Sequence, residues 1–461
     1  MAEDLNQDHA PEEGDYEIDR EILRPVLGAL EAGDAEALSA LLEPLHAADI
    51  ADLFEQVDDE TRVELVRLYG REFDGELLSE LDEGIREEVI DALHPKVLTD
   101  AVRELETDDV VDLIEDLDAP QQEAILDALE AHDRVAVERS LTYPEYSAGR
   151  LMQREMVVAP AHWTVGEAID FMRSADELPE QFYHVILVDP RIRPTGYVTL
   201  GRIMASPREV KLTDIAEESI RIIPVLQDEA EVAYAFNQYH LISAPVVDED
   251  ERLVGVITID DAMVVLDEEH EEDILRLAGV DEESAISDGV IETTWRRVPW
   301  LGVNLVTAIL ASLVIAQFEQ TIAKMVALAV LMPIVASMGG NAGTQTLTVA
   351  VRALATKDLT TANVWRVIKR EVLVGLVNGL VFAVLMGIVG AIWFGTPLLG
   401  VVIAIAMVIN LLVAGLVGVG IPVLLDKVGV DPALASGAFV TTVTDVVGFF
   451  AFLWLAGMVL L

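Results

Sequence analysis

The sequence predicts a multidomain membrane protein with three parts: an all-α superhelical N domain, an α/β tandem pair, and an all-α transmembrane domain of five helices. Three observations lead to this fold class. Charge is divided along the chain, since residues 1–292 carry 75 acidic and 21 basic side chains and residues 293–461 carry six and nine. The early sequence follows a helical period, and the late sequence consists mostly of long apolar runs.

The acidic composition limits the functions that the chain can have. Residues 1–19 are polar and lack an apolar segment, so we expect a disordered tail and no signal peptide. A net charge of −51 repels nucleic acid and attracts cations. We assign most of these charges to solubility in a salty, halophilic cytoplasm and a minority to cation sensing. The absence of cysteine excludes disulfides and thiolate metal sites.

The expected N domain covers residues 20–141. Stretches such as LLSELDEGIREEVIDALHPKVLTDAV and LETDDVVDLIEDLDAPQQEAILDAL pair short amphipathic helices that open on Asp or Thr caps. The pairs recur at a spacing of roughly 25–30 residues, which is typical of helical hairpins stacked into a superhelix.

Two α/β units follow, residues 142–206 and 207–266. The first contains HVILVDP and TGYVTL, and the second contains APVVDEDERLVGVITIDDAM, whose last strand ends at Thr258 before a helix opened by Asp260 and Asp261. These units resemble a tandem pair of CBS domains. The resemblance implies that Asp260 contacts the ribose of ATP or another adenosyl ligand, and Gly201 replaces this carboxylate in the first unit.

Residues 267–294 are expected to form an acidic connecting helix and a polar linker that lead into the transmembrane domain, residues 295–461. Five stretches are long and apolar enough to span a bilayer: 298–318, 322–340, 371–394, 398–425 and 433–460. If the N-terminal part is cytoplasmic, eight basic residues lie inside and Lys324 lies outside, as the positive-inside rule requires. We therefore expect the C-terminus outside.

Asp445 is a lone carboxylate in the apolar run from Pro432 to Leu461. A charge inside a bilayer is costly and usually marks a functional site. Thr441 lies one turn before it, and a second polar stripe follows Gly339 and Gly340, which permit close approach of helices or unwinding. The two stripes predict an ion path between two spans, with the metal contacts Asp445, Thr441, Asn341 and Gln345, and with Thr344 and Thr348 beside them.

Oxygen ligands alone suit a hydrated Mg²⁺ ion, although Mn²⁺, Co²⁺ and Ca²⁺ remain open on spacing alone. The sequence holds no His or Cys cluster that would favour zinc or copper. It also lacks a phosphate loop and a nucleophile elbow, so we do not expect an enzyme.

Four further motifs are specific to one family: YPEYSAGRLM, RRVPWLGVNL, MPIVASMGGNAGTQ with VRALA, and GVDPALASGAFVTTVTDVVGF. With them, the chain from about residue 22 to its end resembles the MgtE magnesium channels and transporters. Tyr146 departs from the pattern, because relatives commonly carry an acidic residue there.

The resemblance implies a plasma-membrane homodimer that takes up Mg²⁺ through a pore between the second and fifth spans of both chains. It further implies that the connecting helix is a plug, closed by cytosolic Mg²⁺ bound between the N domain, the CBS pair and the plug. The positions that match the sensor ligands are Asp228, Asp261, Glu269, Glu272, Asp273 and Asp431, with Asp108, Asp109 and Asp112 as further candidates in the N domain.

Two alternatives stay open. The first is a transporter of another divalent cation such as Mn²⁺ or Co²⁺. The second is a CBS-regulated membrane sensor that transports nothing, although an anchor would need one span and no Asp445.

Overall fold

The computed structural model describes residues 20–460 apart from residues 71, 116, 176–177, 180, 218 and 281–289. The expected disordered tail, residues 1–19, and part of the expected linker therefore lie outside the described residues. The chain divides into two compact units, Met1–Asp267 and Glu268–Leu461. We describe each unit by itself.

The first unit begins with an all-helical region, as predicted, and ten helices lie there within the described residues. Side chains of Asp58, Asp82 and Asp118 cap three of them by accepting backbone N–H groups, which are otherwise unpaired at a helix start. The helices enclose an apolar core that includes the fully buried Phe54 and Leu113. They are α1 (Arg20–Ala32), α2 (Ala35–Leu42), α3 (Ala47–Glu55), α4 (Asp59–Tyr69), α5 (Gly75–Ser79), α6 (Glu83–Ala92), α7 (Pro95–Val102), α8 (Thr107–Glu115), α9 (Ala119–Ala128) and α10 (Ala131–Ser140).

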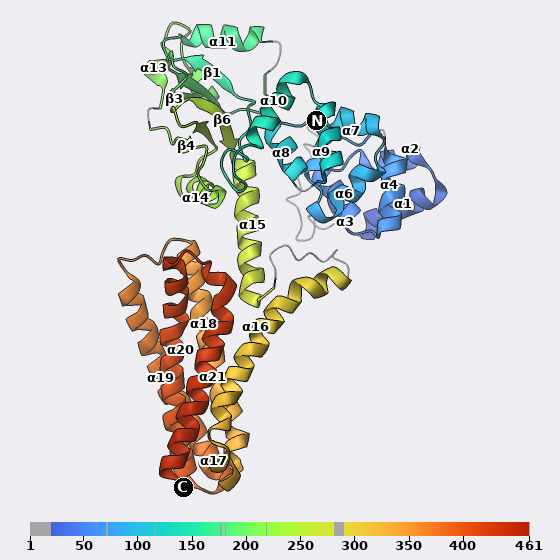
Figure 1. Ribbon diagram of the computed structural model, residues 1–461. Coiled ribbons are helices and arrows are strands. Elements are labelled where there is room, and N and C mark those ends of the chain that lie inside the picture. Colours follow the sequence, from blue (N-terminus) through green and yellow to red (C-terminus); the bar gives the residue numbers. More distant parts are fainter. Residues whose placement is uncertain are drawn as a thin grey trace, which may run out of the picture. The chain divides into compact units, whose positions relative to one another are not determined.

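Two similar α/β units complete the first unit and confirm the predicted tandem pair (Figure 1). In each three-stranded sheet, the first strand is parallel to the second, and the second is antiparallel to the third. One unit contains β1 (Val157–Pro160), α11 (Val165–Ser174), β2 (His184–Val188), β3 (Pro194–Thr199), α12 (Leu200–Ala205) and α13 (Leu212–Ile215). The other contains β4 (Ile223–Pro224), α14 (Glu229–Tyr239), β5 (Ser243–Val247) and β6 (Leu253–Thr258), followed by α15 (Ile259–Ala278), which extends into the second unit.

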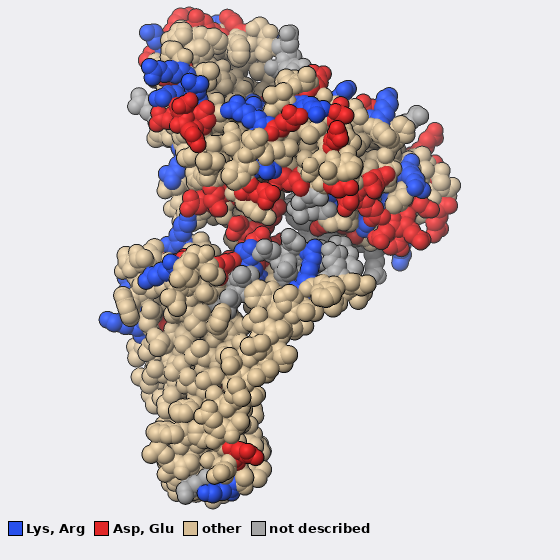
Figure 2. Space-filling model, viewed as in Figure 1, with Lys and Arg blue, Asp and Glu red and all other residues tan. Residues whose placement is uncertain are grey.

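The second unit holds, among its described residues, five helices that are long and apolar enough to cross a membrane. The exposed acidic residues seen in Figure 2 lie mainly on the first unit, and these helices present almost no charge along their length. The elements are α16 (Val290–Ala316), the short α17 (Glu319–Lys324), α18 (Ala327–Ala355), α19 (Val364–Phe394), α20 (Pro397–Lys427) and α21 (Pro432–Val459).

The second span differs from its prediction. Residues 322–340 were expected to cross the membrane, but α17 is separate and α18 continues as a helix through Gly339 and Gly340 to Ala355. Apolar composition stops at Asn341, whereas the helical period does not, so composition alone ends the span too early. The polar stripe is consequently part of a membrane-length helix, and the glycines serve close approach and not unwinding.

Small residues set the spacing of the transmembrane helices. A Cβ atom at Gly375 of α19 would lie 2.5 Å from the Leu411 carbonyl oxygen, and one at Gly415 of α20 would lie 2.5 Å from the Glu371 carbonyl oxygen. Helices in lipid gain little from apolar burial and associate through such close backbone contacts. The interface of α19 with α20 is therefore fixed by its glycines.

Candidate functional site

Asp445 lies on α21 with its side chain half-buried. Within the described residues, no hydrogen bond or ion pair engages its carboxylate. One turn earlier, the Thr441 hydroxyl donates to the carbonyl oxygens of Gly437 and Ala438 at 3.0 and 3.1 Å, which leaves its oxygen free to accept. This face of α21 therefore offers a full negative charge and a hydroxyl oxygen.

The second polar stripe lies on α18, and all four of its side chains are exposed in the single chain. The hydroxyls of Thr344 and Thr348 donate to carbonyl oxygens one turn earlier, both at 3.0 Å. The amides of Asn341 and Gln345 form no hydrogen bond with another described residue. Polar groups on a membrane-spanning helix do not face lipid without a partner, so this stripe requires water or protein beside it.

Glycines bring α18 close to α21. A Cβ at Gly343 would lie 2.6 Å from Cγ1 of Val440, and one at Gly340 would lie 3.9 Å from the methyl carbon of Thr441. Helix α18, which carries the second polar stripe, therefore packs against α21, which carries Asp445. The two predicted stripes belong to neighbouring helices.

A basic residue joins the end of α15 to the start of α21. The Arg276 guanidinium lies 2.7 Å from the Asp431 carboxylate and 2.8 Å from that of Glu272. Beside them, burial and then the negative charge of Asp431 raise the pKa of the Asp273 carboxyl. Leu277 packs with an apolar cluster of α18 and α21 that includes Val440. The last turns of α15 are thus held against the two stripe-bearing helices.

A buried carboxylate cluster forms in the first unit where α8 meets the start of α15; its members are Glu106, Asp108, Asp109 and Asp261. Asp108 is 7% exposed, and burial followed by the charge of Asp261 raises the pKa of its carboxyl well above the usual range. Burial likewise raises the pKa of Asp261 to about 7, although the Thr258 hydroxyl donates to it at 2.7 Å. The pKa of Asp109 rises to about 6 because of burial.

Glu106 belongs to this cluster, and sequence reasoning missed it. The Gln153 amide donates to its carboxylate at 2.6 Å, and burial followed by the charge of Glu155 raises its pKa to about 7. Glu155 in turn accepts the hydroxyl of Thr107, at the first residue of α8, at 2.6 Å. The one available signal was an acidic residue immediately before a helix that opens on Thr-Asp-Asp.

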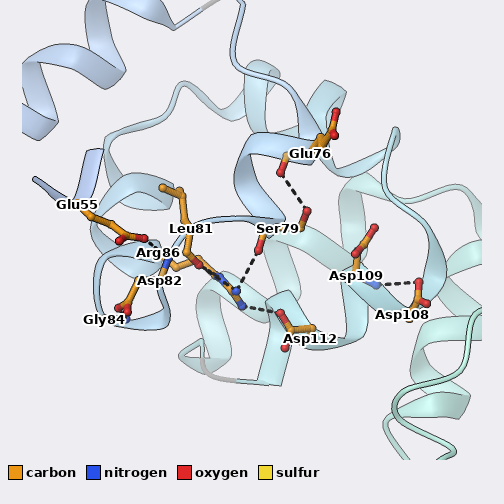
Figure 3. Close-up of polar contacts among 10 residues, drawn as sticks. All are labelled: Glu55, Glu76, Ser79, Leu81, Asp82, Gly84, Arg86, Asp108, Asp109 and Asp112. Carbon is orange, nitrogen blue, oxygen red and sulfur yellow. Dashed lines mark hydrogen bonds and ion pairs between the residues drawn. The ribbon is translucent and has the colours of Figure 1, made fainter. Parts of the chain in front are cut away.

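Other predicted ligands have structural partners of their own. Asp112 is 60% exposed and pairs with Arg86 at 2.9 Å, while the Asp108 carboxylate accepts the backbone N–H of Asp109 (Figure 3). Asp228 is exposed and caps α14 by accepting the Glu231 N–H. Glu269 lies on α15 in the second unit with a half-buried side chain.

The donor chemistry of the cluster suits a hard cation. Among the described residues, no three His, Cys, Asp or Glu side chains are arranged tightly enough to enclose a metal ion. The raised pKa values nevertheless show that burial and mutual repulsion disfavour the charged carboxylates. A divalent cation with oxygen ligands would relieve both effects after small movements.

A small cavity of about 20 Å³ lies between the two sheets of the first unit. Its lining includes Gln153, Tyr183, His184, Ser243 and Thr258, and the His184 Nδ1 lies 2.6 Å from the Ser243 hydroxyl. Asp260, the predicted ribose contact, is exposed in the first turn of α15 and is not among the residues that line this cavity.

Five membrane-spanning helices, the last of which carries one carboxylate within its apolar run, are joined to an acidic N domain and a CBS pair and define a membrane transport protein with regulatory soluble domains. Family models agree with this architecture: MgtE, a divalent cation transporter, matches residues 332–455, the MgtE intracellular N domain matches 45–146, and the CBS domain matches 148–209 and 212–268. The chain belongs to the MgtE family.

Relatives cover almost the whole chain. The magnesium transporter MgtE of Bacillus subtilis (strain 168) is 30% identical over 95% of this chain and 97% of its own length. The magnesium transporter MgtE of Thermus thermophilus is 34% identical over 94% of this chain and 97% of its own. A crystal structure of the cytosolic domain of the Mg²⁺ channel MgtE in complex with ATP is 30% identical, covers 53% of this chain and 99% of that one, and has a TM-score of 0.49. Membership of a transporter family points away from an enzyme.

Proposed function

We propose that this protein is a Mg²⁺-selective channel or transporter that mediates magnesium uptake across the plasma membrane. The observation that carries the proposal is Asp445, a carboxylate on a membrane-spanning helix with no partner among the described residues. An unpaired charge at that depth is unfavourable unless water and a cation reach it. The magnesium transporters that resemble the chain along nearly all its length support the choice of cation.

Mg²⁺ passes as a hydrated ion, with Asp445 and Thr441 on one side of the path and Asn341 and Gln345 on the other. Oxygen groups of this kind hold the ion through its waters, because Mg²⁺ dehydrates reluctantly. Transport of Mn²⁺ or Co²⁺ is the alternative, since neither ion is excluded by these ligands.

The working form is a homodimer. The four side chains of the α18 polar stripe are exposed in the single chain, and polar side chains are unfavourable in contact with lipid. A second copy placed against this face covers the stripe and brings two copies of Asp445 to one ion path. The soluble domains face the cytoplasm and the C-terminus lies outside, in keeping with the basic residues at the inner ends of the spans.

Cytosolic Mg²⁺ closes the pore. Asp108, Asp109 and Asp261 of the buried cluster would hold the ion in the first unit, and Glu269, Glu272, Asp273 and Asp431 would do so at the plug, which here is the part of α15 after Asp267. Glu272 and Asp431 would first have to leave Arg276. Asp112 and Asp228 are further candidate ligands that would likewise have to leave their present partners. When Mg²⁺ falls, the carboxylates repel one another at close range and the plug is released.

A nucleotide is a second regulatory ligand in this proposal. The cavity between the sheets has a volume of about 20 Å³, so a nucleotide would have to widen it. Tyr183 in its lining would then be available to stack on a base, and Ser243 and Thr258 would have to exchange their bonds to His184 and Asp261 for bonds to the ligand. Asp260 would reach the ribose of ATP or another adenosyl ligand from the start of α15.

Flux into vesicles tests the function. The purified protein is reconstituted, and uptake of Mg²⁺, Mn²⁺ and Co²⁺ is compared with that of an Asp445→Ala variant. We expect Mg²⁺ uptake to exceed that of the other ions and to disappear in the variant. Faster Mn²⁺ or Co²⁺ uptake would favour the other divalent transporter, and the absence of any uptake would favour a sensor.

A further inference from the structure

Asn410 is a polar residue at the centre of the most apolar part of the molecule. It lies within α20 and is 0% exposed. Its amide nitrogen donates to the Val335 carbonyl oxygen of α18 at 2.8 Å, and its amide oxygen has no protein partner in the described structure. Asn410 thus forms a hydrogen bond between two helices.

Two glycines enclose this amide from neighbouring helices. A Cβ at Gly339 of α18 would lie 2.1 Å from the Asn410 Nδ2, and one at Gly448 of α21 would lie 2.8 Å from the same atom. Gly339 comes two residues before Asn341, and Gly448 comes three residues after Asp445. Asn410 therefore contacts both helices that carry the polar stripes, close to the residues of the proposed ion path.

Packing alone does not account for an asparagine here. A leucine, which is branched at the same carbon, would not bury an amide oxygen that lacks a partner, and buried polar groups are unfavourable unless matched. A single buried asparagine in an apolar helix interface can fix the register of the helices at some loss of stability. It does so because sliding one helix past another breaks the hydrogen bond and leaves the donor unpaired.

We propose that Asn410 is a positioning residue for the ion path. By donating to the Val335 carbonyl and fitting between Gly339 and Gly448, it fixes the position of the α18 polar stripe along the helix axis relative to Asp445. It does not touch the ion. This inference rests on the proposed function, because it assigns Asn410 to the alignment of that path.

Asn410→Leu tests the proposal. Asn378→Leu is the matched control, because it is the same substitution at an exposed position on α19. Two quantities are measured on the full-length protein: the melting temperature, and uptake of Mg²⁺ and Mn²⁺ into vesicles. We expect Asn410→Leu to keep or raise the melting temperature while Mg²⁺ uptake falls by about three- to tenfold and discrimination against Mn²⁺ is lost. The control should behave as the wild type.

Asn410→Asp places at the same position a group that can donate a hydrogen bond only when it is protonated. A protonated aspartic acid can donate to the Val335 carbonyl, whereas an ionised one cannot. We expect uptake by this variant, relative to the wild type at the same pH, to recover as the pH is lowered.

Unchanged uptake and discrimination in Asn410→Leu would overturn the inference. So would a melting temperature that falls in step with uptake, because that pattern describes a residue needed for stability alone. Failure of the proposed function has a different signature, since the wild type would then take up no Mg²⁺ or Asp445→Asn would take it up normally; either result overturns this inference as well.

Discussion

Replacing Asp261 with asparagine removes one negative charge from the buried carboxylate cluster and keeps an oxygen that can accept the Thr258 hydroxyl. The pKa of Asp261 is raised from 3.8 to about 7, mainly by burial, so the folded state disfavours its ionised form. At about 1.4 kcal/mol per pKa unit, this amounts to about 4 kcal/mol near pH 8 without a divalent cation. Asp108 and Asp109 share the same repulsion, so we expect the substitution to recover about 2–4 kcal/mol.

The assay is thermal unfolding of the purified full-length protein in chelator and in Mg²⁺. In chelator, the transition of the soluble part should rise by about 4–16 °C, given about 2–4 °C per kcal/mol for a unit of this size. In Mg²⁺ the variant should gain less than the wild type does, because one ligand charge is missing. Asp267→Asn is the control, since Asp267 is an exposed carboxylate on the same helix that does not belong to the cluster. A transition in chelator that stays unchanged or falls would refute the reasoning.

Three further predictions follow from the same structure. Without divalent cations, the soluble part should lose stability as the pH rises from about 4.5 to about 7. The pKa of Glu106 is about 7 in the folded state and 4.5 in the unfolded chain, so between these values the folded protein keeps a proton that the unfolded chain releases. A melting temperature that is flat or rising over this range would contradict the burial of the cluster. Arg276→Gln should free the carboxylates of Asp431 and Glu272 from their cation and so lower the Mg²⁺ concentration that closes the pore, measured by vesicle uptake; equal closure in wild type and variant would count against these ligands. Gly375→Ala should cost about 1–3 kcal/mol, because the new Cβ would lie 2.5 Å from a carbonyl oxygen, whereas Gly302→Ala has nothing within 4 Å and should be neutral in the same melting experiment.

The architecture could be predicted from the sequence because it depends on local periodicity and on composition. Helical repeats, alternating strands and apolar runs are readable without knowing the tertiary contacts. Asp445 could be identified for the same reason, because a single charged residue in a long apolar segment is visible from local composition. The end of the second span could not be read from composition, because α18 continues as a helix through polar residues to Ala355.

Contacts between distant residues were the part that sequence reasoning could not supply. Arg276 pairs with Asp431 across 155 positions, and nothing in either neighbourhood signals the other. Among so many acidic residues, the sequence also could not tell a helix cap such as Asp228 from a buried member of the cluster such as Asp108. Burial separates these roles, and burial is a tertiary property.

Mg²⁺ uptake by Asp445→Asn in reconstituted vesicles tests the central claim most directly. The substitution removes the charge at nearly constant size, and Asp426→Asn, at an exposed position near the end of α20, provides the matched control. The account predicts that Mg²⁺ uptake falls to the level of empty vesicles in Asp445→Asn and stays at the wild-type level in Asp426→Asn. Wild-type uptake by Asp445→Asn would contradict the assignment of this carboxylate to the ion path.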